Sequence, residues 1–262
     1  MSDATHKDPK VLEEEAYVYL YHEKYHEAFG LFKKAGDLYR VIGNHKQAAI
    51  CLAAAGSSWS IKSGEKTFYN AAVSYEEAAK EARSAGDYEY ASMLYRYAAV
   101  NYEKDMEFYN FSECFYRSKQ CRRKFITYLL INPKKIRPIA KIEEEHGIKN
   151  FIKLLFSWFA LSIASLVWGY GERPWRAAYA ALSVICVSAG LYTCGTLARG
   201  AVPFQPNFIE AMYFSIVTFS TVGYGDIVPV GFSKVVAAGE VLSGMLTTSI
   251  FIVSLSRKYL RI

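Results

Sequence analysis

Residues 221–226 read Thr-Val-Gly-Tyr-Gly-Asp and lie between two long apolar stretches, at about 177–197 and 233–256. A helix is expected over 208–219, just before these residues, but it is too short to cross a hydrocarbon core of roughly 30 Å. Such a helix enters the membrane and stops inside it, and the backbone that follows must be surrounded by protein or water. The stretch therefore predicts a re-entrant pore helix and loop within a membrane domain.

A short linker over 199–203 leads toward this half-length helix, and the next residues carry a helix start signal. Asn207 can accept a hydrogen bond from the first turn, and Glu210, three residues later, completes a capping-box pattern. We therefore expect the helix to begin directly after Asn207.

A row of backbone carbonyls that face one axis can replace the water oxygens of a dehydrated potassium ion. Carbonyls align in this way only if alternate residues adopt conformations that most side chains cannot reach, which explains Gly223 and Gly225. We expect K⁺ as the permeant ion, with no cofactor. The carbonyls expected to bind it, with Gly225 completing the filter, are those of Thr221, Val222, Gly223 and Tyr224.

The side chains of this segment have separate expected roles. The Thr221 hydroxyl closes the inner ion site, and the Tyr224 ring packs outward as a spacer. Asp226 is expected at the outer mouth, where a carboxylate can bond to neighbouring side chains and raise the local concentration of cations.

The block YFSIVTFSTVGYGDIVP, from Tyr213 to Pro229, resembles the pore-helix and filter block of potassium channels whose pore is built from two helices. The resemblance implies that Thr218 is the pore-helix threonine behind the filter and that Tyr213 and Phe214 are aromatic residues that buttress it. Some bacterial members carry a glutamate that bonds to the filter aspartate, where this chain has Val217. That form of filter inactivation is therefore not implied here.

The last apolar stretch contains two glycines and one acid with candidate roles. Gly244 lies near the position where the family has an inner-helix glycine hinge, and Gly239 is a second candidate; a packing notch is an equally open interpretation. Glu240 is an ionisable residue in a membrane helix, which makes it a functional candidate. The alternative for Glu240 is a place near the outer or lateral interface, paired with a polar neighbour.

Each chain contributes one filter sequence, whereas a potassium filter is made of four. A homotetramer follows. Residues 151–170 hold one lysine, and Arg176 stands at the edge of the next apolar stretch, so no charged voltage-sensing helix is indicated. We therefore expect regulation through the N-terminal half.

An internal repeat with an offset of 43 residues organises the N-terminal half. Small and aromatic residues recur at this offset: Tyr25, Phe68 and Phe111; Ala28, Ala71 and Cys114; Ala35, Ala78 and Cys121; and Trp59 with Tyr102. Gly43-Asn44 and Gly86-Asp87 recur as turns in which the glycine precedes a good helix cap. We predict a stack of antiparallel helix pairs, each burying its apolar face against its neighbours.

This pattern resembles the tetratricopeptide-like repeats of the SNAP family of vesicle-fusion adaptors, over residues 11–130, and a repeat of this kind favours a protein or peptide partner on its concave face. The expected fold class is all-α: an α-solenoid of helix hairpins followed by a tetrameric membrane pore domain. The expected domains are a cytoplasmic helical-repeat domain over 1–131, a basic linker over 132–150, an interfacial or re-entrant membrane helix and turn over 151–174, and the pore domain over 175–262.

A block of nine cations without an acid runs from Arg117 to Lys141; its members are Arg117, Lys119, Arg122, Arg123, Lys124, Lys134, Lys135, Arg137 and Lys141. Next to a membrane segment, such a block favours contact with anionic lipids on the cytoplasmic side. Nucleic-acid binding is not indicated, because no base-reading module accompanies the block. The five cysteines form no CxxC pair and are expected to be buried thiols.

The topology follows from the filter. Asp226 faces outside in the family, so the final helix is expected to run inward and leave the C-terminus in the cytoplasm, as its cations favour. The helix before the filter then begins on the cytoplasmic side. If 151–170 spanned the membrane, the basic block and the folded repeat would lie outside, although no secretory signal is expected before them. We therefore expect 151–170 not to cross and to reach the outer helix through a turn at 169–174; an ordinary span remains the alternative.

Together these features predict a subunit of a potassium-selective channel in the cell membrane, with the N-terminal domain and the C-terminus in the cytoplasm. The alternative is a membrane-anchored tetrameric adaptor whose pore module does not conduct. An enzyme is not expected, because no nucleophile, carboxylate pair or metal-spaced His cluster stands out among five scattered histidines.

Overall fold

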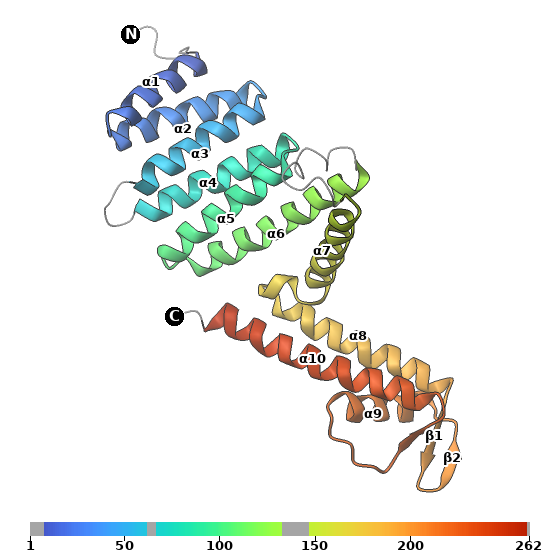
Figure 1. Cartoon of the computed structure of the whole chain (residues 1–262). Coiled ribbons are helices and arrows are strands. Elements are labelled where there is room, and N and C mark those ends of the chain that lie inside the picture. The colour runs from blue at the N-terminus through green and yellow to red at the C-terminus, as the bar shows by residue number, and fades with distance from the viewer. Residues whose placement is uncertain (1–7, 62–66, 133–146, 261–262) are drawn as a thin grey trace. The chain divides into compact units, whose positions relative to one another are not determined.

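The computed structural model describes residues 8–61, 67–132 and 147–260 (Figure 1). The chain divides into two compact units, Met1–Ser162 and Ile163–Ile262. The division falls inside one helix, α7 (Gly147–Val167). Each unit has its own hydrophobic core, so each is described by itself.

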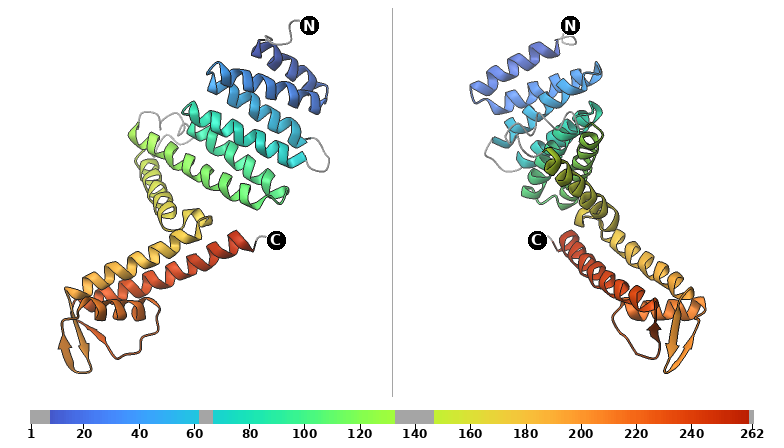
Figure 2. Two further views of the ribbon diagram at one scale, coloured as in Figure 1. Left: turned by 180° about the vertical axis from the view of Figure 1, so that it is seen from behind. Right: turned by 45° about the vertical axis from the view of Figure 1, so that its right-hand side comes forward.

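The first unit is a stack of helices in chain order: α1 (Pro9–Tyr21), α2 (Tyr25–Val41), α3 (His45–Ile61), α4 (Thr67–Ser84), α5 (Tyr88–Lys104) and α6 (Phe108–Ile131). Each of these helices packs against the one before it and the one after it, as the two views in Figure 2 also show. This arrangement confirms the predicted solenoid of helix hairpins.

The 43-residue offset marks the positions at which the helices of this stack touch. Ala28, Ala71 and Cys114 are all buried, and so is the matched set of Ala35, Ala78 and Cys121. Small side chains there allow close approach, while larger rings such as Phe32 fill the space between the helices. The residues that recur at the 43-residue offset therefore form part of the core between the stacked helices.

Four turns in the stack have one residue each in the left-handed region: Glu23, Gly43, Gly86 and Met106. In each turn the next amide donates back to a carbonyl five residues earlier, as Asp87 does to Ala82 at 2.9 Å. This bond closes the end of the preceding helix in the manner of a Schellman cap. The two glycine turns are as predicted, whereas Glu23 and Met106 carry no glycine signal and were not foreseen.

The predicted caps are also present. The Asn44 side chain accepts from the Gln47 amide at 3.2 Å, and the Asp87 side chain accepts from the Tyr90 amide at 3.0 Å. Each bond satisfies an amide that the first helical turn leaves without a partner.

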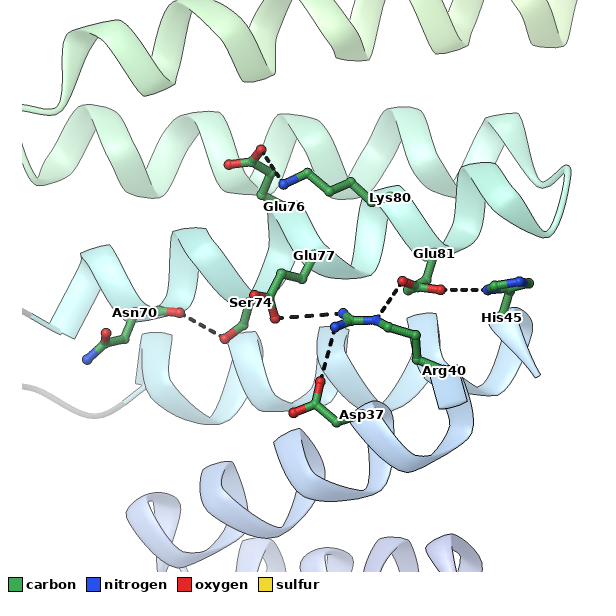
Figure 3. A network of polar contacts seen from close by, with 9 residues as sticks. All are labelled: Asp37, Arg40, His45, Asn70, Ser74, Glu76, Glu77, Lys80 and Glu81. Carbon is green, nitrogen blue, oxygen red and sulfur yellow. Dashed lines mark hydrogen bonds and ion pairs between the residues drawn. The ribbon is translucent and has the colours of Figure 1, made fainter. Parts of the chain in front are cut away.

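Buried carboxylates connect helices that are distant in sequence (Figure 3). Arg40 on α2 donates from Nε to Glu81 on α4 at 2.7 Å, and the His45 Nδ1 atom lies 2.7 Å from the other oxygen of that carboxylate. Glu81 is only 8% exposed, so its desolvation has to be offset by these partners. The network thereby fixes the alignment of α4 against α2 and α3.

A second, longer repeat is visible only in the contacts. The Glu13 carboxylate accepts from the Tyr39 hydroxyl at 3.0 Å, and the Glu76 carboxylate accepts from the Tyr102 hydroxyl at 3.1 Å. The two pairs occupy matching places in α1–α2 and α4–α5, and both bridge a helix to its neighbour. The first three helices and the next three thus repeat a polar contact as well as a core.

The second unit contains α8 (Pro174–Thr193), α9 (Phe208–Phe219) and α10 (Ser233–Tyr259), with the short turn helix η2 (Gly169–Gly171) before them. The helices α8 and α10 lie side by side, and α9 packs near one end of this pair (Figure 1). Both α8 and α10 are long and apolar enough to cross a membrane, whereas the apolar run in α7, over 151–167, is shorter. The turn expected at 169–174 is present.

A small sheet, which the sequence did not predict, accompanies these helices. Strand β1 (Thr196–Arg199) pairs antiparallel with β2 (Val202–Phe204) and with β3 (Val228–Val230), in the order β2-β1-β3. The expected linker at 199–203 is therefore mostly a hairpin. Strands of three or four residues show too little alternation to be recognised in sequence.

Helix boundaries also need correction. The outer helix was expected at about 177–197 but occupies Pro174–Thr193, because its last expected residues begin β1. The inner helix was expected to end near 256 and continues to Tyr259. Of the predicted linker over 132–150, residues 147–150 already belong to α7, and 133–146 lie outside the described residues.

Two other expectations fare differently. Cys51, Cys114 and Cys121 are buried thiols as predicted. Cys186 on α8 and Cys194 directly after α8 are exposed, which corrects the prediction for these two. Residues 133–141 of the basic block lie outside the described residues. On α6, Arg117 lies 3.2 Å from Glu76, so this member of the block pairs within the repeat.

The four turns predict opposite effects for matched substitutions. In a fragment of residues 1–145, which we expect to fold alone, Gly86→Ala should destabilise by about 1 kcal/mol, because alanine is strained at a φ of +79°. Met106→Gly should stabilise by up to about 1 kcal/mol, because Met106 has a φ of 58° and is 76% exposed. Urea unfolding followed by circular dichroism measures both, and equal signs would contradict the shared turn geometry.

Candidate functional site

The pore helix α9 begins as the sequence predicts. The Asn207 side chain accepts from the Glu210 amide at 2.9 Å, and the Glu210 carboxylate accepts from the Asn207 amide at 3.2 Å. Arg199 at the end of β1 lies 3.2 Å from the same carboxylate. The start of α9 is thus fixed by a capping box and tied to the small sheet.

The backbone after α9 alternates in handedness. Thr221, Gly223 and Gly225 have positive φ values of 57°, 57° and 78°, whereas Val222 and Tyr224 between them do not. Alternation of this kind turns successive peptide units so that their carbonyls can face one direction. The glycines occupy such positions, as predicted.

The amides of this segment are turned back onto the pore helix. The Thr221 amide donates to the Thr218 carbonyl at 3.0 Å, and the Val222 amide donates to the Val217 carbonyl at 3.1 Å. In the part of the chain that the structure describes, no backbone amide donates to the carbonyls of 221–225. Because these carbonyls keep their acceptor capacity, they form the candidate cation site.

The positive φ of Thr221 was not predicted. A β-branched residue in the left-handed region costs of the order of 1–3 kcal/mol and persists only where its surroundings enforce it. The two hydrogen bonds from the Thr221 and Val222 amides to the end of α9 supply that constraint. Backbone strain therefore lies at the first residue of the candidate site.

The far end of the segment is anchored by different contacts. The Tyr213 hydroxyl on α9 donates to the Asp226 carboxylate at 2.9 Å. Ile227 is buried, and the next residues form β3, in which Pro229 stands opposite Leu197 of β1. The segment is therefore held at both ends, first by the carbonyls of α9 and then by Tyr213 and the sheet.

The other residues suggested by sequence lie at different depths. Phe214 is buried and packs edge-on against Tyr192 of α8, with ring centroids 4.8 Å apart, so it supports α9 from the side of the outer helix. Thr218 is half-buried at the end of α9. Tyr224 is 70% exposed, so the chain itself does not supply the packing that was expected for its ring.

Two residues that sequence analysis missed contact Glu240. The Tyr192 hydroxyl of α8 donates to Glu240 at 2.7 Å, and the Ser215 hydroxyl of α9 lies within hydrogen-bonding distance of its other oxygen. Glu240 is 2% exposed, so its place is the interior of the unit and not a lateral interface. An acid in the last helix signals a buried contact, but only the fold shows which hydroxyls meet it.

The two glycine candidates in α10 differ in their surroundings. A Cβ atom added at Gly244 would lie 2.5 Å from the Phe219 carbonyl oxygen, whereas one at Gly239 would meet nothing within 4 Å. Gly244 is therefore a packing notch that admits the last residue of α9. Of the two interpretations that the sequence left open, the geometry supports the notch.

The family comparison covers this unit. Residues 179–261 match the family model of ion channels. This part of the chain is therefore similar to ion channels and is called the ion-channel domain. The match and the two long apolar helices α8 and α10 are consistent with a membrane protein and favour an ion channel.

A shorter likeness concerns one curated protein. A stretch of 22 residues is 86% identical to two-pore potassium channel 4 of Arabidopsis thaliana, over 8% of this chain and 8% of that one. The chain thus spans a small part of the relative that it matches. No solved structure matches the chain.

The notch predicts unequal effects for two alanine substitutions in the ion-channel domain. Gly244→Ala should lower the thermal unfolding midpoint of the detergent-solubilised protein, at a cost of about 1–3 kcal/mol, because the new methyl group overlaps the Phe219 carbonyl. Gly239→Ala is the matched control and should change the midpoint little. A stable Gly244→Ala variant with altered channel opening would instead favour the hinge.

Proposed function

We propose that this chain is a subunit of a homotetrameric channel selective for potassium. The observation that carries the proposal is the free row of carbonyls over 221–225, with alternating backbone handedness and amides tied to α9. Four such segments around one axis would offer rings of carbonyl oxygens that replace the hydration shell of K⁺. The ion is held by Thr221, Val222, Gly223 and Tyr224.

Two further observations support potassium and a tetramer. The short stretch of high identity belongs to a protein named as a potassium channel. On the isolated chain Val222 is 53% exposed and Tyr224 is 70% exposed, although both are large apolar side chains of a constrained segment. Neighbouring subunits around the pore axis would cover them, with Tyr224 packed against the next pore helix.

Potassium flux into liposomes tests the proposal. Purified chain should admit K⁺ far faster than Na⁺, and Gly223→Ala should abolish this selectivity, because alanine is strained at the φ of +57° found there. The matched control is Gly190→Ala on α8, where the same added methyl meets nothing within 4 Å. Both variants should elute as tetramers. Absence of K⁺ flux through a well-folded tetramer would favour the non-conducting adaptor.

We further propose that the N-terminal unit regulates opening through the turn before α8. The turn residue Glu172 is 1% exposed and lies 3.5 Å from Arg257 near the C-terminal end of α10. The side chain of Arg257 also covers Gly171, since a Cβ there would come within 3.1 Å of it. The helix α7 leads directly into this turn. A displacement of α7 can therefore be transmitted to α10 through the Glu172–Arg257 ion pair.

This regulation requires the ion pair. In planar bilayers, a chain that begins at Asn150 should differ in open probability from the full chain, because it lacks the repeat. Glu172→Gln should remove that difference, since the turn then loses its charged contact with Arg257. Lys258→Gln removes a neighbouring cation of α10 as the control and should preserve the difference. Persistence of the difference in Glu172→Gln would refute transmission through the turn.

A further inference from the structure

A buried polar cluster lies where the three helices of the ion-channel domain meet. Glu240 of α10, Ser215 of α9 and Tyr192 of α8 are all 2% exposed or less. Each comes from a different helix, and each bonds to another member of the cluster. Burying a carboxyl group among apolar helices costs free energy unless the group is hydrogen-bonded. The hydrogen bonds of this cluster therefore have to offset the desolvation of Glu240.

The proton count of the cluster defines how Glu240 is bonded. The single hydroxyl proton of Ser215 has two acceptors in reach, the Ile185 carbonyl at 2.9 Å and Glu240. The Tyr192 hydroxyl already donates to the other Glu240 oxygen. The Ser188 hydroxyl of α8 is a further hydrogen-bonding partner of Glu240. The contacts are satisfied together if Glu240 is a neutral carboxylic acid that donates to Ser215 and accepts from Tyr192 and Ser188, while Ser215 donates to Ile185. The acid then acts as donor and acceptor between two helices.

The position of Ser215 connects this cluster to the filter. Ser215 lies in the middle of α9, two residues before Val217, whose carbonyl accepts the Val222 amide at 3.1 Å. One turn further along α10, Gly244 fits against the Phe219 carbonyl at the end of α9. The inner helix therefore holds the pore helix by a hydrogen bond at its middle and by close packing at its end.

We propose that Glu240 is a positioning residue for the selectivity filter. Its carboxyl group joins α9 to α8 and α10, and so fixes the place of the carbonyls that follow α9. The group bonds to Tyr192 and Ser215, which lie outside 221–226, and it acts on the filter through Ser215. A filter tolerates displacement of only a fraction of an ångström, because its selectivity depends on where its oxygens stand. The inference rests on the proposed potassium conduction.

Substitutions at Glu240 separate hydrogen bonding from charge and from bulk. Glu240→Gln keeps a donor and an acceptor on a side chain of the same shape, so the K⁺/Na⁺ permeability ratio should stay within about twofold of the original. Glu240→Leu keeps bulk but removes both bonds, and the ratio should fall by about tenfold or more, since sub-ångström placement is lost. Single-channel recording reports the ratio per open channel, independently of how much protein folds.

The partners supply a second arm and a control. Ser215→Ala should lower the ratio in the same direction as Glu240→Leu, and the double variant should be no worse than the more severe single one, because the two share one bond. Ser183→Ala removes a hydroxyl of α8 that bonds only to its own helix, at the Tyr179 carbonyl, and should leave the ratio unchanged.

The outcomes distinguish the two levels of the argument. If the unmodified chain shows no K⁺ selectivity, the proposed function fails. If it is selective and Glu240→Leu forms a tetramer with an unchanged ratio, Glu240 does not position the filter. If Glu240→Gln fails as severely as Glu240→Leu, a charge is required and the neutral-acid bond is wrong. Retention in Glu240→Gln with loss in Glu240→Leu and Ser215→Ala supports the inference.

Discussion

The ion-channel domain depends on the bonds by which the first filter amides turn back onto the end of the pore helix. The amides of Thr221 and Val222 are satisfied by the carbonyls of α9, and among the described residues no backbone amide donates to the carbonyls of 221–225. If these carbonyls accepted hydrogen bonds within a helix or sheet, they could not coordinate a cation. The same bonds hold Thr221 in a conformation that a β-branched residue avoids. The Tyr213–Asp226 hydrogen bond and the pairing of β3 with β1 hold the other end of the segment.

Support for the pore helix comes from all sides of its own unit. The outer helix contributes Tyr192, which packs against Phe214 and bonds to Glu240. The inner helix contributes that acid together with the notch at Gly244. The small sheet holds the exit of the filter through β3. In the proposed re-entrant arrangement lipid offers α9 no polar contacts, so its neighbours would have to supply them.

The N-terminal unit follows a different physical rule. Its hairpins bury small residues at regular positions, and each helix needs only its neighbours, so the stack can grow without a single central core. Buried carboxylates such as Glu81 fix how neighbouring helices align, because a misaligned pair would leave an unpaired buried charge, which is far more costly than the pair. After the stack, helix α7 leads to the turn that contains Glu172, which lies 3.5 Å from Arg257.

The sequence alone determined the elements whose signals are local. The period of 43 residues, the capping box at Asn207 and the glycines of the filter each depend on neighbours in the chain, and each was predicted from residue types. Tertiary structure alone decided the rest. The three-stranded sheet, the partners of Glu240 and the contact of Gly244 join segments distant in sequence, and one residue type is compatible with many such partners. A glycine or an acid in a membrane helix indicates that a close or polar contact exists, but only the packed helices determine which atoms make it.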